Sequence, residues 1–135
     1  MTILVTGGCG FVGSALAQFL CNDGNYAGKI ILYDVKPPIQ TLEESSNAIF
    51  LKGDITSGHD LLSAFKGHQV EAVIHAAGFG LAGTTNLPAF NDVTKKVNVD
   101  GTQRVIEACL LNNVKALGKV TIHFFASFLS MKKQV

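Results

Sequence analysis

Four glycines near the start of the chain have the spacing of a phosphate-binding turn. They lie in the segment VTGGCGFVGSAL (Val5–Leu16), at Gly7, Gly8, Gly10 and Gly13. An apolar run precedes them and a helical pattern follows, so they occupy a tight strand-to-helix turn whose φ angles other residues resist. A pyrophosphate can approach a backbone without Cβ atoms closely, and the N–H groups at the start of a helix attract it. The spacing of Gly7, Gly10 and Gly13 therefore predicts a dinucleotide-binding turn.

A carboxylate follows at the distance expected for ribose recognition. Asp34 lies 21 residues after Gly13, near the end of the run KIILYDV (Lys29–Val35). A carboxylate at that place would accept hydrogen bonds from the hydroxyls of the adenosine ribose and would repel a 2′-phosphate. The pattern therefore favours NAD over NADP. The alternative interpretation is a glycine-rich turn with an exposed aspartate.

Five apolar runs and three helical patterns would position these residues. The runs are typical of buried strands, and the helical patterns place apolar residues on one face. The predicted strands are Thr2–Thr6, Lys29–Val35, Ala48–Lys52, Glu71–His75 and Val120–Phe125, and the predicted helices are Phe11–Cys21, His59–Lys66 and Asp92–Asn113. Strands that alternate with helices and are apolar throughout predict an α/β fold. We expect a doubly wound parallel sheet covered on both faces, with strand order 3-2-1-4-5.

The composition is that of a globular domain without an obligatory charged partner. The 135 residues are 47% hydrophobic and 16% charged, with a formal net charge of +1. This balance gives no indication of a nucleic-acid partner or an anionic membrane surface, and no apolar run is long enough to span a bilayer. The three cysteines and four histidines lack metal-ligand spacing. We therefore expect no metal site, and reduced thiols in a cytoplasmic compartment.

Four motifs together resemble the extended short-chain dehydrogenase/reductase superfamily. TGGCGFVG (Thr6–Gly13) is similar to the Thr-Gly-Gly-x-Gly-Phe-x-Gly signature, and GDI (Gly53–Ile55), IHAAG (Ile74–Gly78) and VNVDGT (Val97–Thr102) follow in the same order. Within the superfamily the chain is similar to the 3β-hydroxysteroid dehydrogenase/isomerase family. The segments VIHAAGFGLAG and KKVNVDGTQRVIEAC most resemble its family 42E branch. The resemblance covers about residues 2–115.

The resemblance implies an NAD(P)-binding Rossmann fold whose cofactor contacts come from these segments. Asp54 would meet the adenine amino group, Ile55 would pack on the adenine ring, and Asn98 would belong to a structural and catalytic network. The cofactor-binding residues that it implies are Gly7, Gly10, Phe11, Val12, Gly13, Asp34, Asp54, Ile55, Ala76, Ala77 and Gly78. The family activity would be NAD-dependent oxidation of the CH–OH group of a 3β-hydroxysteroid or a similar alcohol.

The catalytic pair of the family has no counterpart in this sequence. The family uses Tyr-x-x-x-Lys, with the tyrosine as general acid/base and the lysine lowering its pKa, together with an upstream Ser or Thr that binds the substrate oxygen. The only tyrosines here are Tyr26 and Tyr33, and neither is followed four residues later by lysine. Counting without a gap places Thr121 at the hydroxyl position, whereas an insertion places Ser127 there. We therefore expect little or no turnover from this chain.

The family pattern ends near Leu117. We expect a partial Rossmann domain over residues 1–117 and a divergent tail over residues 118–135 with a possible fifth strand, as in a C-terminally truncated isoform. Besides an oxidoreductase by descent, two functions stay open. One is a non-catalytic dinucleotide-binding module that dimerises with a full-length relative through an exposed sheet edge. The other is a fragment of a sugar-nucleotide epimerase or reductase. The full-length family is often membrane-associated, but these residues carry no anchor.

Overall fold

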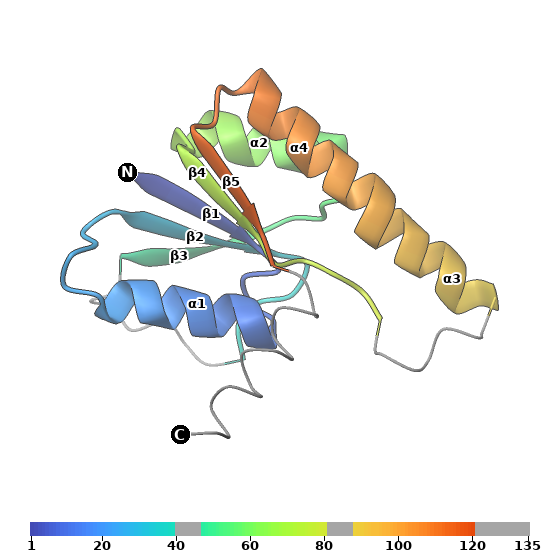
Figure 1. Cartoon of the computed structure of the whole chain (residues 1–135), viewed down its shortest axis with the longest axis horizontal. Helices are drawn as coiled ribbons and strands as arrows, with labels where there is room; N and C mark the ends of the chain where they lie inside the picture. Colours follow the sequence, from blue (N-terminus) through green and yellow to red (C-terminus); the bar gives the residue numbers. More distant parts are fainter. Residues whose placement is uncertain (40–46, 81–87, 121–135) are drawn as a thin grey trace.

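A five-stranded parallel sheet forms the centre of the computed structural model, which describes residues 1–39, 47–80 and 88–120 (Figure 1). The strand order is β3-β2-β1-β4-β5, which confirms the predicted order and the doubly wound fold class. Every neighbouring pair of strands is parallel. The strands are β1 (Thr2–Thr6), β2 (Lys29–Asp34), β3 (Ala48–Lys52), β4 (Ala72–His75) and β5 (Ala116–Lys119).

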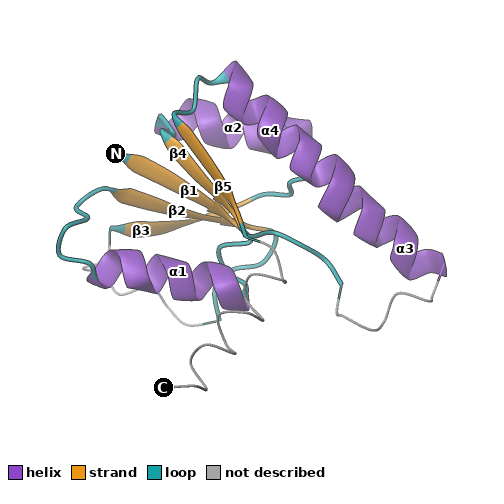
Figure 2. Ribbon diagram, in the orientation of Figure 1, coloured by secondary structure: helices purple, strands orange, loops and turns teal. Residues whose placement is uncertain are grey.

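Helices cover both faces of the sheet, as the apolar strands require. Helix α1 (Phe11–Asn22) lies on one side, and α2 (Gly58–His68) and α4 (Thr102–Leu111) lie on the other (Figure 2). Side chains of β1 alternate between the two faces. Ile3 and Val5 pack with Ala17 of α1, whereas Leu4 packs in the core that α2 and α4 close. Because all neighbouring strands are parallel, their carboxyl ends lie at one edge of the sheet.

The long helical stretch before β5 contains a π-helical segment that the sequence did not predict. Helix α3 (Pro88–Lys95) leads into the π-helical segment η1 (Lys96–Gly101), which continues directly into α4. The stretch therefore starts before the predicted Asp92. Gly101 at the end of η1 packs closely on Ile55, because a Cβ added there would lie 2.7 Å from Ile55 Cδ1. Such π-helical turns occur frequently at functional sites.

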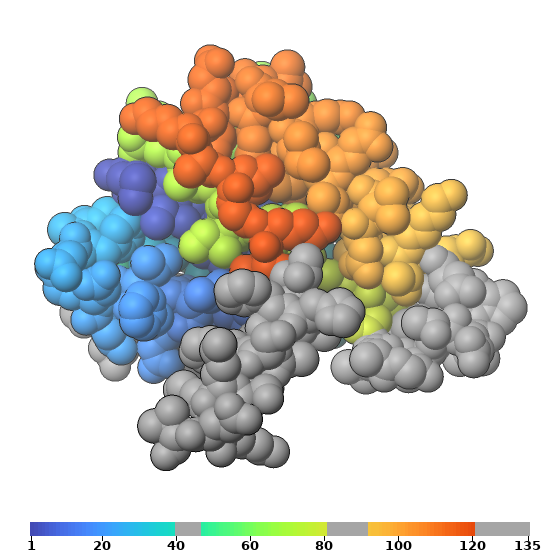
Figure 3. Space-filling view, in the orientation of Figure 1, coloured from blue at the N-terminus to red at the C-terminus, as the bar shows by residue number. Residues whose placement is uncertain are grey.

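The fifth strand lies earlier than expected. We predicted it at Val120–Phe125, but β5 ends at Lys119 and Val120 lies outside it; residues 121–125 fall outside the described part of the chain. All four β5 residues are exposed, and the space-filling view shows this segment at the surface in orange-red (Figure 3). Pairing with β4 places Ala116 opposite Ala72 and Lys119 opposite His75. The described residues place no strand on the far side of β5.

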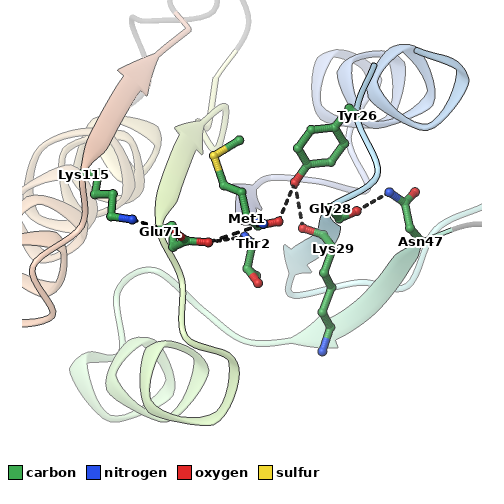
Figure 4. A network of polar contacts seen from close by, with 8 residues as sticks. All are labelled: Met1, Thr2, Tyr26, Gly28, Lys29, Asn47, Glu71 and Lys115. Atoms are coloured by element: carbon green, nitrogen blue, oxygen red, sulfur yellow. Dashed lines mark hydrogen bonds and ion pairs between the residues drawn. The ribbon is translucent and has the colours of Figure 1, made fainter. Parts of the chain in front are cut away.

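A polar network joins the amino ends of the strands (Figure 4). Glu71 accepts a hydrogen bond from the Thr2 backbone N–H at 3.1 Å and pairs with the Lys115 ammonium at 2.8 Å. The hydrogen bond from Lys115 is the main cause that holds the pKa of Glu71 below its usual range. The Tyr26 hydroxyl donates to the Met1 carbonyl oxygen at 3.1 Å. These contacts join the strands at the amino edge of the sheet. They also place Tyr26 at the opposite edge from the glycine turn.

Candidate functional site

The glycine turn connects β1 to α1 in a conformation that needs glycine. Gly7 has a φ of +65°, in the left-handed region, and a Cβ there would lie 2.7 Å from the Ala77 Cα and backbone nitrogen. The Gly10 N–H donates to the Gly7 carbonyl oxygen at 3.0 Å, which closes the turn. Gly10 is then the N-cap of α1 in an extended conformation. The predicted strand–turn–helix context is therefore present.

The start of α1 is suited to a negative ligand. Phe11, Val12 and Gly13 form the first helical turn, which contains no acidic residue, and no side chain caps it among the described residues. A Cβ on Gly13 would overlap the Gly7 carbonyl oxygen. The absence of side-chain atoms at Gly7 and Gly13 thus keeps the turn tight, and the helix N-terminus presents backbone N–H groups and a positive dipole end.

Asp34 lies beside this turn, as the sequence predicted. Its Oδ2 accepts a hydrogen bond from the Cys9 backbone N–H at 3.0 Å, and its Oδ1 lies 3.4 Å from the Lys36 backbone nitrogen, which donates to it. The carboxylate is half-buried at the carboxyl end of β2. These bonds fix its position, and each oxygen retains a lone pair that can accept from a ligand hydroxyl.

Cys9 sits in the turn as a protonated thiol. Burial, and secondly the charge of Asp34, raise its pKa to about 11. The thiolate is the reactive form of cysteine, so this environment disfavours alkylation or oxidation. Burial also raises the pKa of Cys21 and of Cys109. Cys9 therefore fits the variable position of the glycine motif better than a reactive thiol.

Asp54 and Ile55 follow β3 at the same edge of the sheet. The Asp54 Oδ1 accepts from the Thr56 backbone N–H at 2.8 Å, and the Asp54 carbonyl oxygen accepts from the Tyr33 hydroxyl at 3.2 Å. Ile55 is only 6% exposed and belongs to the core beside Gly101. Most of the Ile55 side chain is therefore engaged within the protein, while Asp54 is partly exposed.

The loop after β4 forms a wall next to the glycine turn. Ala76 and Ala77 lie against Gly7, and Gly78 follows with its backbone exposed. Asn98, in the π-helical segment, holds the next residue: its side chain accepts from the Phe79 N–H and donates to the Phe79 carbonyl oxygen, both at 2.8 Å. Asn98 therefore fixes the loop backbone.

His75 links this loop to its surroundings and was not predicted as a site residue. The imidazole is 1% exposed, with Nδ1 2.6 Å from the Thr6 hydroxyl and Nε2 2.9 Å from the Thr102 hydroxyl. Burial, and secondly the charge of Lys119, lower the pKa of His75 to about 4. His75 is therefore neutral at pH 7. The sequence offered no signal for the partners of His75, because the three residues share no periodicity or spacing.

The comparisons with known proteins agree with this geometry. The model of the 3-beta hydroxysteroid dehydrogenase/isomerase family matches residues 4–120. The chain belongs to this family. It is 34% identical over 116 residues to human short-chain dehydrogenase/reductase family 42E member 1, a match that covers 86% of the chain and 28% of that relative. It is 32% identical over 124 residues to human 3 beta-hydroxysteroid dehydrogenase type 7, covering 87% of the chain and 31% of the relative.

A solved structure has the same fold over most of this chain. The NAD complex of the Bordetella bronchiseptica enzyme WbmG superimposes with a TM-score of 0.72 at 26% identity, over 88% of this chain and 36% of WbmG. The chain thus spans less than a third of the length of these two relatives and about a third of the length of WbmG.

The structure brings most of the predicted site residues to one edge of the sheet. The glycine turn, Asp34, Asp54 and the loop at Ala76–Gly78 all lie at or just after carboxyl ends of strands. Open α/β sheets bind ligands at this edge. Thr121 and Ser127, the two alternatives for the hydroxyl of the 3-beta hydroxysteroid dehydrogenase/isomerase family, lie outside the described residues.

Metal-ligand clusters and membrane-spanning helices are both absent from the described residues. Residues 1–39, 47–80 and 88–120 contain no group of three or more His, Cys, Asp or Glu residues that could hold a metal ion. Over the same ranges, no helix combines the length and the apolar character needed to cross a bilayer.

Proposed function

We propose that the chain binds NAD at the edge formed by the glycine turn. The observation that carries the proposal is the tight packing of the glycine turn. A Cβ atom added at Gly7 or Gly13 would clash with neighbouring backbone atoms. The N-terminus of α1, whose first turn contains no acidic residue, and the carboxylate of Asp34 lie beside that turn. The pyrophosphate would lie at the start of α1, and Asp34 would accept the ribose hydroxyls. The NAD complex of WbmG supports the choice of ligand.

Replacing Asp34 by alanine should weaken NAD binding by about ten-fold to a hundred-fold. The reason is that hydrogen bonds to a charged group contribute about 1.5–3 kcal/mol. The same change removes the charge that would repel a 2′-phosphate, so the preference for NAD over NADP should fall. Isothermal titration calorimetry with NAD and NADP measures both effects. Equal affinity of the wild type and the Asp34→Ala variant for NAD would contradict the role of Asp34.

We propose, by relation to the family, that the reaction class is oxidation of the CH–OH group of a 3β-hydroxysteroid or a similar alcohol. NAD, when bound, supplies the hydride acceptor. The residues of this chain bind and orient it, but neither tyrosine is placed as a general acid/base. Burial, and secondly the charges of Asp60 and Asp54, raise the pKa of Tyr33, while Tyr26 lies at the opposite edge.

The chain alone should therefore oxidise a 3β-hydroxysteroid very slowly. Loss of a general acid/base costs about 10²–10⁴-fold in rate. The measurement is NADH formation by absorbance, with full-length human 3 beta-hydroxysteroid dehydrogenase type 7 as the positive control. Turnover within ten-fold of that control would contradict the expectation. The family match does not favour a sugar-nucleotide epimerase.

We also propose that a partner chain pairs with the exposed edge of β5. All four β5 residues are exposed, and unpaired edges recruit strands. The proposed partner is a longer relative of the same family, and the described residues place no strand beside the outer edge of β5.

A further inference from the structure

A continuous chain of hydrogen bonds runs beneath the loop that follows β4. It begins at the Ala77 backbone N–H, 3.4 Å from the Thr6 hydroxyl, and passes through His75 to the Thr102 hydroxyl. Thr102 in turn lies 2.7 Å from the Asn98 carbonyl oxygen. This series of hydrogen bonds thus connects the ends of β1 and β4 to the π-helical segment, on the side of the sheet that α4 covers.

The proton positions in this series of hydrogen bonds follow from the groups at its two ends, Ala77 and Asn98. The Asn98 carbonyl oxygen can only accept, so the Thr102 hydroxyl donates to it and must accept from His75 Nε2–H. The Ala77 N–H can only donate, so the Thr6 hydroxyl accepts from it and donates its own proton to His75 Nδ1. Every group is then satisfied by one neutral imidazole tautomer.

Protonation of His75 would break this arrangement. A second N–H at Nδ1 would point at the Thr6 oxygen, which already accepts from Ala77, and the Thr6 proton would lose its acceptor. Thr6 is 0% exposed, so water cannot replace that acceptor. The charged group that acts on the imidazole is Lys119 of β5, whose ammonium lies 3.2 Å from the Thr102 oxygen. This charge opposes a second one on the ring.

The two ends of the hydrogen-bond chain are the two groups that shape the wall of the proposed site. The backbone of Ala77 lies against Gly7. The side chain of Asn98 makes two hydrogen bonds to the backbone of Phe79. A buried polar network costs free energy unless every member is satisfied. In return it sets directions and distances that an apolar side chain cannot set.

We propose that His75, held between Thr6 and Thr102, is a positioning residue for the dinucleotide: it fixes the loop wall at the distance from the glycine turn that the ligand needs. The inference rests on the proposed function, since it concerns the same site. His75 touches no ligand in this scheme and acts through the backbone of Ala77 and through Asn98.

The test compares Thr102→Val with Thr102→Ser by NAD titration calorimetry. Valine has the shape of threonine but leaves His75 Nε2–H without an acceptor, so NAD affinity should fall about ten-fold or more. Serine retains the hydroxyl and should restore most of the affinity. Phe65→Leu is the control for instability alone, because Phe65 is a buried core residue of α2 outside the network; it should lower the melting temperature and leave NAD affinity unchanged.

The outcomes distinguish failure of the proposed function from failure of the positioning role. A wild-type chain that binds no NAD overturns the proposed function and this inference with it. NAD binding that is equally tight in the wild type and in folded Thr102→Val overturns the positioning role alone. If Thr102→Val does not fold, the imidazole ¹⁵N chemical shifts of His75 in the wild type test the proposal instead. A neutral His75 with the proton on Nε2 at pH 7 supports the proposal, and the other tautomer or a charged ring overturns it.

Discussion

Replacing Gly7 by alanine should abolish NAD binding and lower the free energy of unfolding by about 3 kcal/mol. The left-handed φ of +65° costs a residue with a Cβ about 1–2 kcal/mol. The new Cβ would also lie 2.7 Å from backbone atoms of Ala77, and a forced backbone shift adds about 1–3 kcal/mol. The same shift would move the wall of the nucleotide site. Urea unfolding and NAD titration calorimetry measure the two effects.

Gly67→Ala is the matched control for this experiment. Gly67 lies in α2, and a Cβ there meets nothing within 4 Å. Alanine has the higher helix propensity, so this variant should be about 0.5–1 kcal/mol more stable than the wild type. NAD binding should be unchanged. A Gly7→Ala chain that binds NAD like the wild type would contradict the placement of the pyrophosphate at this turn.

Acidification should destabilise the fold by about 3 kcal/mol between pH 6.5 and pH 4. The native pKa of His75 is about 4, against 6.5 for the free side chain, so the unfolded chain binds the extra proton in this window. The stabilisation is complete above pH 6.5 and is lost as the pH falls towards 4. One pKa unit corresponds to about 1.4 kcal/mol. Urea unfolding at pH 7.5, 6 and 5 follows the loss.

Two variants separate His75 from other titrating groups. Burial, and secondly the charge of Lys29, lower the pKa of His68, so His68 acts in the same window; His68→Gln should keep most of the effect. Lys119→Gln removes a charge that opposes protonation of His75. The Lys119→Gln variant should therefore lose less stability on acidification than the wild type does. Equal stability of the wild type at pH 7.5 and pH 5 would refute the assignment.

The features that could be predicted from the sequence are those with local causes. The β1 strand and the glycines that follow it form one continuous segment, and the φ of Gly7 and the cap at Gly10 are set within it. Asp34 lies at the end of one apolar run and Asp54 lies two residues after another, so their positions near strand ends follow from the sequence. Because parallel strands share one carboxyl edge, these local predictions also place the residues together.

The features that could not be predicted depend on distant contacts. β5 contains Ala116, Leu117, Gly118 and Lys119, none of them β-branched, and it is a strand because β4 pairs with it. The run Val120–Phe125 has a stronger local pattern, and that pattern misled the prediction. The hydrogen-bond chain through His75 joins residues from β1, β4 and α4. No periodicity or spacing in the sequence indicates that these residues are partners.

The position of β1 at the centre of the sheet has a consequence for how the site is assembled during synthesis. β1 precedes both of its neighbours in the chain, and Thr6 meets His75 across 69 positions of sequence. A nascent chain that has emerged only as far as β3 already contains the glycine turn and Asp34. It lacks Ala77, against which Gly7 packs, and so has no loop wall. Pairings of such long range form slowly, and cofactor capture must wait for the arrival of β4.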